Sequence, residues 1–173
     1  MILGSGSPRR SAIMTGMSIP FERRPVDVDE SIRLNEAPLS YVRRLAETKA
    51  REAATRFGQP GTVSIGADTI VLLADRILGE PKDQQEAARM LGALSGQIHE
   101  VITAVSLAMP NGSVDVFHEV TRVRFRILTV AEIDAYIATG SPMDKAGAYG
   151  IQDDAAEFVD DIEGSFSNVV GLP

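Results

Sequence analysis

The sequence predicts an α/β fold in which helices flank a β-sheet of mixed strand direction. Extended apolar runs alternate with amphipathic helical runs along the 173 residues, an order typical of α/β proteins. Two extended runs are joined by Pro110-Asn111-Gly112, and Asn-Gly favours the primed turns of β-hairpins. The length suits one domain, or one domain with two lobes.

The first third of the chain is expected to hold short strands around two helices. Residues 1–3 and 21–28 are expected to be extended. A helix is expected over residues 8–15, because Ser7 is a good N-cap and proline suits the first helical position. A long helix is expected over residues 38–57, where apolar residues keep helical spacing until a glycine follows.

The middle of the chain is expected to hold two buried strands separated by a helix. Residues 63–73 are apolar and rich in β-branched side chains, as in a buried strand. Asp83 and Glu86 form an Asp-based capping box that opens a helix to Leu94. Residues 101–108 are expected to form the next strand.

The last third begins with the return strand of the hairpin, over residues 114–128. Apolar residues alternate there with Arg122, Arg124 and Arg126, which indicates one buried and one solvated face. Thr129 and Glu132 are expected to cap a helix that runs to about Ala138. The remaining segments are expected to be a loop at 144–154 and strands at 157–162 and 168–171.

Composition excludes several classes of protein. The net charge of −7 argues against a nucleic-acid polymer as partner, because duplex-binding domains are usually basic. The apolar runs are too short to cross a membrane, so no membrane partner is expected. The absence of cysteine leaves no disulfide or thiolate metal site and fits a cytoplasmic location.

The run from Leu3 to Arg10, LGSGSPRR, has the features of a phosphate-binding loop. Its small residues allow successive backbone N–H groups to turn inward and form an anion-binding nest. A helix that starts at Pro8 points its free N–H groups and its positive dipole end at the loop. Arg9 and Arg10 add forked cations suited to phosphate oxygens. The alternative is a capped surface helix with solvated arginines.

A second polar group lies inside the apolar run at residues 63–73. Asp68, in Gly66-Ala67-Asp68-Thr69, is costly to bury unless it is paired, hydrogen-bonded or bound to metal. It is therefore either a structural residue that caps a turn, or an acid that holds a divalent cation or activates water.

Taken together, the motifs resemble those of the Maf family of nucleoside triphosphate pyrophosphatases. They occur in the family's order over nearly the whole chain. The matching runs are Ser5-Gly6-Ser7-Pro8-Arg9-Arg10, Asp29-Glu30, Glu47-Thr48-Lys49-Ala50, Gly66-Ala67-Asp68-Thr69, Leu94-Ser95-Gly96, the stretch from Asp144 to Gln152, and Asn168-Val169-Val170-Gly171-Leu172-Pro173.

The resemblance implies a fold, a reaction and an assembly. The fold is the one shared with ITP pyrophosphatases: a mixed sheet flanked by helices, with two lobes and a cleft between them, here a single Maf-like domain over residues 1–173. The reaction is hydrolysis of a nucleoside triphosphate to a monophosphate and pyrophosphate. A divalent cation (Mg, Mn or Co) is required, and a homodimer is usual.

The resemblance also implies roles for individual residues. Asp68 matches the catalytic acid and a metal ligand, and Glu30 is a plausible second metal carboxylate or a member of a solvated acidic loop. The residues expected to bind substrate phosphates are Ser5, Ser7, Arg10, Lys49 and Lys145.

Three positions that separate substrate classes within the family are Arg9, Thr69 and Gln152 here, and they resemble the subgroup that acts on dTTP and UTP. The amide of Gln152 offers a donor and an acceptor, which suits the imide edge of uracil or thymine. Modified pyrimidine triphosphates are also expected substrates. Tyr149 is a candidate base contact, whereas His99 is expected to be an ordinary strand residue.

The chain departs from the family pattern at several positions. Glu80 stands where the family usually has lysine, and Lys82 is expected to take over part of that role. Asp153 stands where glycine often follows the glutamine. The sequence stops at Pro173, where relatives continue into a helix, so that helix is expected to be absent.

A second hypothesis remains open. The family name is tied to inhibition of septum formation, so the chain is alternatively a nucleotide-binding regulator of cell division without turnover. Product analysis separates the two hypotheses, since only the enzyme releases pyrophosphate.

Overall fold

The computed structural model describes residues 1–152 and 154–173, and Asp153 lies outside the described residues. The chain divides into two compact units. The first holds residues 1–69, 103–119 and 171–173, and the second holds residues 70–102 and 120–170. Each unit is thus assembled from segments that are far apart in the sequence.

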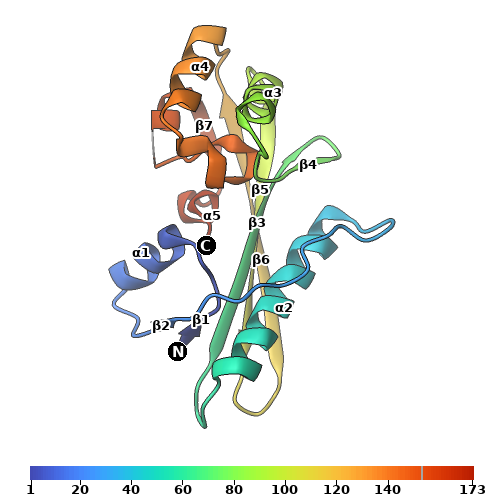
Figure 1. The fold of residues 1–173 in the computed structure, drawn as a ribbon, viewed down its shortest axis with the longest axis vertical. Coiled ribbons are helices and arrows are strands. Elements are labelled where there is room, and N and C mark those ends of the chain that lie inside the picture. Colours follow the sequence, from blue (N-terminus) through green and yellow to red (C-terminus); the bar gives the residue numbers. More distant parts are fainter. Residues whose placement is uncertain (153) are drawn as a thin grey trace. The chain divides into compact units, whose positions relative to one another are not determined.

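The strands form a mixed sheet, as the sequence predicts. They are β1 (Ile2–Leu3), β2 (Glu22–Arg23), β3 (Ser64–Leu73), β4 (Arg76–Leu78), β5 (Ile98–Ala108), β6 (Val114–Phe125) and β7 (Val159–Glu163). Their order is β2-β1-β3-β5-β6-β7, and β4 pairs with β3 (Figure 1). β1 is parallel to β2 and β3, whereas the β3–β4 and β6–β7 pairs are antiparallel.

All but the last of the helices begin and end close to the predicted residues. They are α1 (Pro8–Gly16), α2 (Pro38–Phe57), α3 (Gln84–Leu94), α4 (Val130–Ala138) and α5 (Phe166–Val170), with short 3₁₀ turns η1 (Ser141–Asp144), η2 (Ala146–Ala148) and η3 (Asp154–Phe158). Ser7 caps α1, Asp83 caps α3, and Thr129 with Glu132 forms a capping box on α4. None of the helices among the described residues is long and apolar enough to cross a membrane.

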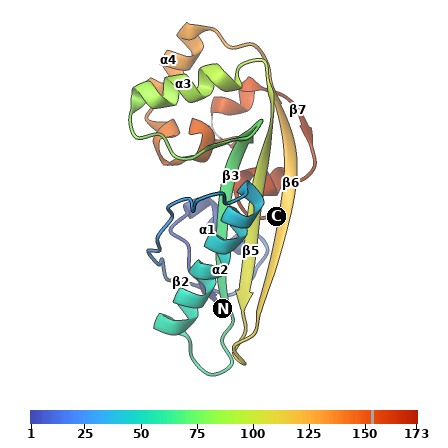
Figure 2. The same ribbon diagram turned by 90° about the vertical axis from the view of Figure 1, so that its right-hand side faces the viewer.

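In the first unit, α2 packs against β1 and lies along the strands (Figure 2). Its buried residues are Tyr41 and the helical stripe predicted from spacing, which is Val42, Leu45, Ala46, Ala50 and Ala53. A separate cluster joins Leu3, Met14, Ile65 and Leu172. The core of the first unit thus joins α2 and α1 to β1 and to the first part of β3.

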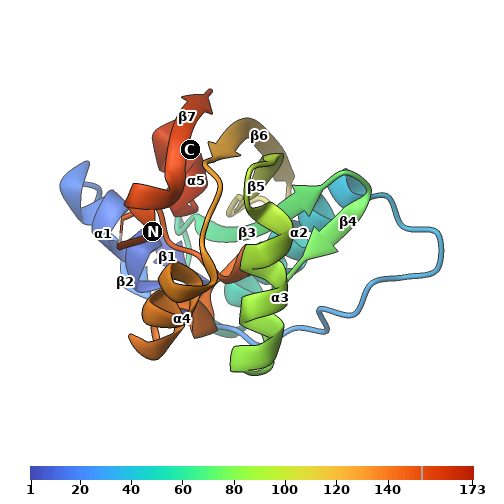
Figure 3. The same cartoon turned by 90° about the horizontal axis from the view of Figure 1, so that it is seen from above.

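In the second unit, α3 and α4 pack against each other (Figure 3). The core there is aromatic: the rings of Phe125 and Tyr149 meet edge to face with centroids 4.8 Å apart. His99 is 1% exposed, and its Nε2 lies 2.8 Å from the Tyr149 hydroxyl. Burial lowers the pKa of His99 to about 4. His99 is therefore a strand residue of the core, as expected, and Tyr149, 5% exposed, is a core residue and not an available base contact.

Three sequence predictions about local structure are wrong. Residues 168–171 do not form a strand: α5 covers most of them, and its start is fixed by Ser165, whose hydroxyl accepts from the Asn168 N–H at 3.2 Å. The loop predicted at 144–154 contains 3₁₀ turns. The hairpin turn is not primed, because only Gly112 within it has positive φ, and proline before asparagine favours a type I turn.

Strand boundaries also differ from the prediction. The extended run at 21–28 contributes only two residues to the sheet as β2. β6 ends at Phe125, so the predicted alternation of buried and solvated residues ends there, and Ile127 is 80% exposed.

Candidate active site

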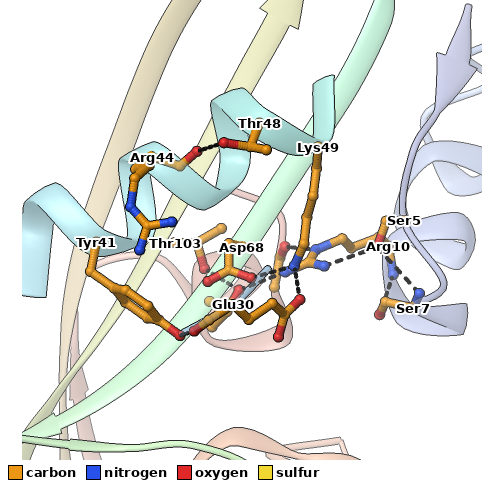
Figure 4. Close-up of polar contacts among 12 residues, drawn as sticks. Ser5, Ser7, Arg10, Glu30, Tyr41, Arg44, Thr48, Lys49, Asp68 and Thr103 are labelled. Atoms are coloured by element: carbon orange, nitrogen blue, oxygen red, sulfur yellow. Dashed lines mark hydrogen bonds and ion pairs between the residues drawn. The ribbon is translucent and has the colours of Figure 1, made fainter. Parts of the chain in front are cut away.

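Two carboxylates share one ammonium group in the first unit. Lys49, on α2, places its Nζ 2.7 Å from Oδ1 of Asp68 on β3 and 2.7 Å from Oε1 of Glu30. Figure 4 shows the three side chains pointing toward one another. The side chains of Lys49 and Asp68 are each 12% exposed, whereas that of Glu30 is 57% exposed. The arrangement is a buried ion pair with a second, solvent-facing carboxylate.

Lys49 reaches Asp68 because two glycines let α2 approach the strands closely. A Cβ at Gly66 would lie 2.2 Å from the carbonyl oxygen of Ala46 and 2.3 Å from the nitrogen of Ala50. A Cβ at Gly4 would lie 3.1 Å from the carbonyl oxygen of Lys49 itself. Any larger residue at position 66 therefore forces the helix and the strand apart.

The pKa of Asp68 is raised above its ordinary value. Burial is the largest cause, and Lys49 and Arg10 oppose it with their positive charges. A carboxylate with a raised pKa is a better proton acceptor than an exposed one.

The loop before α1 has the predicted capping geometry. The Ser7 hydroxyl accepts from the Arg10 N–H at 3.4 Å, and Pro8 occupies the first turn. The Ser5 hydroxyl accepts from the Ser7 N–H at 3.2 Å. The guanidinium of Arg23 donates to the carbonyl oxygen of Gly6 and fixes the loop from the side of β2. The loop is thus ordered by its own side chains at the N-terminus of a helix.

Arg10 connects this loop to the rest of the site. Only 9% exposed, it donates to Ser5 Oγ at 2.9 Å, to Thr69 Oγ1 at 2.9 Å and to the Gly171 carbonyl oxygen at 2.7 Å. These three acceptors come from the loop, from β3 next to Asp68, and from the end of the chain. Arg10 therefore joins these three segments by hydrogen bonds within the protein. The phosphate-binding interpretation did not include this structural role.

The Thr69 hydroxyl is oriented by two partners. It accepts a hydrogen bond from Arg10 and lies 2.9 Å from the hydroxyl of Thr103 on β5. Thr103 is fully buried. Sequence reasoning missed Thr103, because only the pairing of β3 with β5 brings it to Thr69.

The segment that carries Glu30 is held by α2. The Tyr41 hydroxyl donates to the Glu30 carbonyl oxygen at 2.8 Å (Figure 4). Sequence reasoning missed Tyr41 as well. The spacing of Tyr41 and Lys49 could have indicated it, because residues eight apart on one helix lie on the same side of that helix.

Comparison with known proteins gives the family. The model described as "Maf-like protein" matches residues 1–173. The chain belongs to the Maf family. Curated relatives carry the name dTTP/UTP pyrophosphatase: that of Geobacillus sp. (strain WCH70) is 49% identical over 173 residues, covering all of this chain and 91% of the relative. That of Symbiobacterium thermophilum is 46% identical over 173 residues, covering 88% of the relative.

A solved structure matches more distantly. It is a nucleoside-triphosphatase, a dITP/XTP pyrophosphatase of Mycobacterium abscessus, with 16% identity, a TM-score of 0.43 and 72% of each chain covered.

The remaining predicted residues of this Maf chain are distributed between the two units. Arg9 lies on α1, beside Arg10. Lys82, Lys145 and Gln152 belong to the second unit. Lys82 is exposed in a bend just before α3, where its N–H donates to Glu86 at 2.8 Å. Lys145 is 8% exposed, and its ammonium donates to Asp144 at 2.7 Å.

Members of the Maf family are generally dependent on a divalent cation. The acidic residues of the first unit fit such an ion. Asp68 and Glu30 already hold one positive charge between them, and Mg²⁺ commonly takes one or two carboxylates together with phosphate oxygens. No group of three or more histidine, cysteine or acidic residues suited to a metal occurs in the part of the chain that the structure describes. Within the described part of the first unit, Asp68 and Glu30 together with substrate oxygens would therefore fit such an ion.

Proposed function

We propose that this protein is a nucleoside triphosphate pyrophosphatase that hydrolyses dTTP and UTP to the monophosphate and pyrophosphate. The observation that carries the proposal is the buried Asp68–Lys49 pair, extended by Glu30 and joined through Arg10 to a phosphate-type loop. The names of the curated relatives, which match over the whole chain, support the same reaction.

Asp68 acts as the general base in this proposal. It takes a proton from a water molecule, whose oxygen bonds to the α-phosphorus. The bond between the α-phosphorus and the bridging oxygen breaks, and its electron pair leaves with pyrophosphate. The raised pKa of Asp68 supports this role, because a base is most effective when its pKa approaches the working pH.

The positive groups bind and orient the triphosphate. Lys49 stabilises the charge that develops on the leaving pyrophosphate. The loop that carries Ser5 and Ser7, with the N-terminus of α1, is proposed to bind phosphate oxygens. Arg10 keeps that loop in place through Ser5.

The divalent cation, of which Mg, Mn and Co are the candidates, is proposed to bind at Asp68 and Glu30. When bound, it supplies Lewis-acid neutralisation of phosphate charge. Glu30, the more exposed of the two carboxylates, faces the solvent from which an ion and substrate arrive.

Substrate choice is proposed to depend on Arg9, Thr69 and Gln152. Lys82 and Lys145 are kept as proposed phosphate contacts, with Lys82 standing in for the lysine that Glu80 replaces. Modified pyrimidine triphosphates belong to the same substrate class. A single functional domain over residues 1–173, a homodimer and a cytoplasmic location complete the proposal.

The test is product analysis over a panel of dTTP, UTP, GTP and dATP with Mg²⁺ or Mn²⁺. Monophosphate and pyrophosphate are expected, with dTTP and UTP as the best substrates. Release of orthophosphate would contradict the assigned bond. Tight binding without products would instead favour a regulator that does not turn over its nucleotide.

A further inference from the structure

The acidic segment that carries Glu30 has little regular structure of its own. It belongs to the long irregular stretch between β2 and α2, which Figure 3 shows looping out before the helix begins. The Glu30 side chain is 57% exposed and touches Lys49 through a single ion pair. An exposed ion pair on an irregular segment contributes little by itself to fixing the segment's position. Something else must therefore hold Glu30 where it lies.

Two side chains of α2 hold this segment by its backbone. The Tyr41 hydroxyl donates to the carbonyl oxygen of Glu30 at 2.8 Å, and the Arg44 guanidinium donates to the carbonyl oxygen of the next residue, Ser31, at 3.0 Å. The guanidinium of Arg44 also lies over the Tyr41 ring, 5.5 Å from its centroid. Two consecutive carbonyl groups are thus bound by one helix.

Arg44 binds the far end of the same segment through Glu36. Its Nε and Nη2 donate to the two carboxylate oxygens at 2.6 and 2.7 Å, a bidentate pair whose side chains are 17% and 9% exposed. Glu36 also accepts from the Arg33 N–H at 3.0 Å. One arginine therefore closes the loop from Ser31 to Glu36.

The charges of this arrangement do not change near neutral pH. The hydrogen bond from Arg44 lowers the pKa of Glu36 to about 2, so its carboxylate stays ionised. Burial, together with Asp68 and Glu30, raises the pKa of Tyr41, so its phenol stays a donor.

We propose that Tyr41 and Arg44 are positioning residues that hold Glu30 ready for the divalent cation and the substrate phosphates. This inference rests on the proposed function. Tyr41 and Arg44 lie on the same helix as Lys49. One rigid element therefore determines the positions of both the Lys49 ammonium and the Glu30 carboxylate that pairs with it. They act through Glu30 and do not contact the reacting atoms.

The first arm of the test is kinetic, with Mn²⁺ titrated against UTP. Tyr41→Phe and Arg44→Lys are expected to raise the Mn²⁺ concentration for half-maximal rate about 2- to 10-fold, the effect of one lost hydrogen bond, with little change in kcat at saturating Mn²⁺. Arg44→Lys keeps the charge but loses the fork. Thr55→Val is the matched control, since it removes a hydroxyl bond to the backbone on the same helix, away from the loop.

The second arm separates positioning from general damage. If Tyr41 acts through Glu30, the double variant Glu30→Gln/Tyr41→Phe behaves like Glu30→Gln alone. Additive losses would overturn the proposal, as would an unchanged Mn²⁺ requirement in both single variants.

The third arm needs no activity and uses hydrogen exchange of the peptide spanning residues 29–36. Exchange is expected to accelerate in Tyr41→Phe and Arg44→Lys but not in Thr55→Val, and equal rates in all proteins would overturn the proposal. A wild-type protein that releases no pyrophosphate would refute the proposed function, whereas the exchange arm would still decide whether the loop is held by these residues.

Discussion

At the scale of single residues, the ammonium group of Lys49 lies 2.7 Å from a carboxylate oxygen of Asp68 and 2.7 Å from one of Glu30. Asp68, Lys49 and Glu30 were recognisable because each belongs to a short matched motif. Thr103 and Tyr41 were not, because their role depends on which residue lies opposite them in the folded chain. Arg10 was predicted to bind phosphate, yet its three hydrogen bonds within the protein follow only from the fold.

Asp68→Asn is expected to lower kcat for UTP about 10²- to 10⁴-fold, because an amide cannot accept the proton of the attacking water. The protein should remain folded, since the amide keeps the size of the side chain and Glu30 still pairs with Lys49. Asp115→Asn, at an exposed position of β6, serves as the control. If Asp68→Asn kept more than about a tenth of the wild-type rate, Asp68 would not be the base.

The buried His99 is expected to make stability depend on pH. Its pKa is about 4 in the folded state and about 6.5 when unfolded, so the unfolded state binds more protons between these values. Stability should therefore fall by about 3 kcal/mol as pH drops from 7 to 4 on this account.

The measurement for His99 is the free energy of unfolding in urea at several pH values. His99→Gln should show a shallower fall than the wild type below pH 6.5. His118→Gln, which replaces an exposed histidine, is the matched control. An identical pH dependence in His99→Gln and the wild type would contradict the assignment.

At the scale of elements, helices with strong end signals were predicted almost to the residue. Pro38 and Gly58 bound α2, and Ser7 with Pro8 starts α1, because caps act within one turn and can be read locally. The predicted strand at 168–171 was wrong. β-Branched valines are common in strands, but the Ser165 hydroxyl caps a helix at this point in the chain. The contact of α2 with Gly66 was not predicted, since it depends on the approach of two distant elements.

Gly66→Ala tests that contact between α2 and β3. The added Cβ would overlap the backbone of α2 at Ala46 and Ala50, so the helix must shift and carry Lys49 away from Asp68. We expect kcat to fall at least about tenfold and stability to fall by about 1–3 kcal/mol, as for other overpacked sites.

Gly92→Ala is the matched control, because its Cβ meets nothing within 4 Å on α3. It should leave kcat unchanged and stabilise the protein slightly, by about 0.5–1 kcal/mol. A Gly66→Ala protein with wild-type kcat and stability would show that the close approach is not needed.

At the scale of the whole molecule, the alternation of strands and helices predicted the α/β class and the mixed sheet. The division into units was not readable from local patterns, because β3, β5 and β6 each contribute residues to both. Asp68 and Thr69 are the last residues of β3 that belong to the first unit. Lys82, Lys145 and Gln152 lie in the second unit. The roles of Lys82, Lys145 and Gln152 in substrate binding stay predictions, which kinetic measurements on variants of these residues would test.

The most direct test of the account is hydrolysis of UTP in water enriched in ¹⁸O, with products analysed by mass spectrometry. Attack on the α-phosphorus places the label in UMP and leaves pyrophosphate unlabelled, and this is the predicted result. The Asp68→Asn protein, assayed in parallel, should form neither product at a comparable rate. Label in pyrophosphate, or release of UDP with orthophosphate, would contradict the proposed reaction.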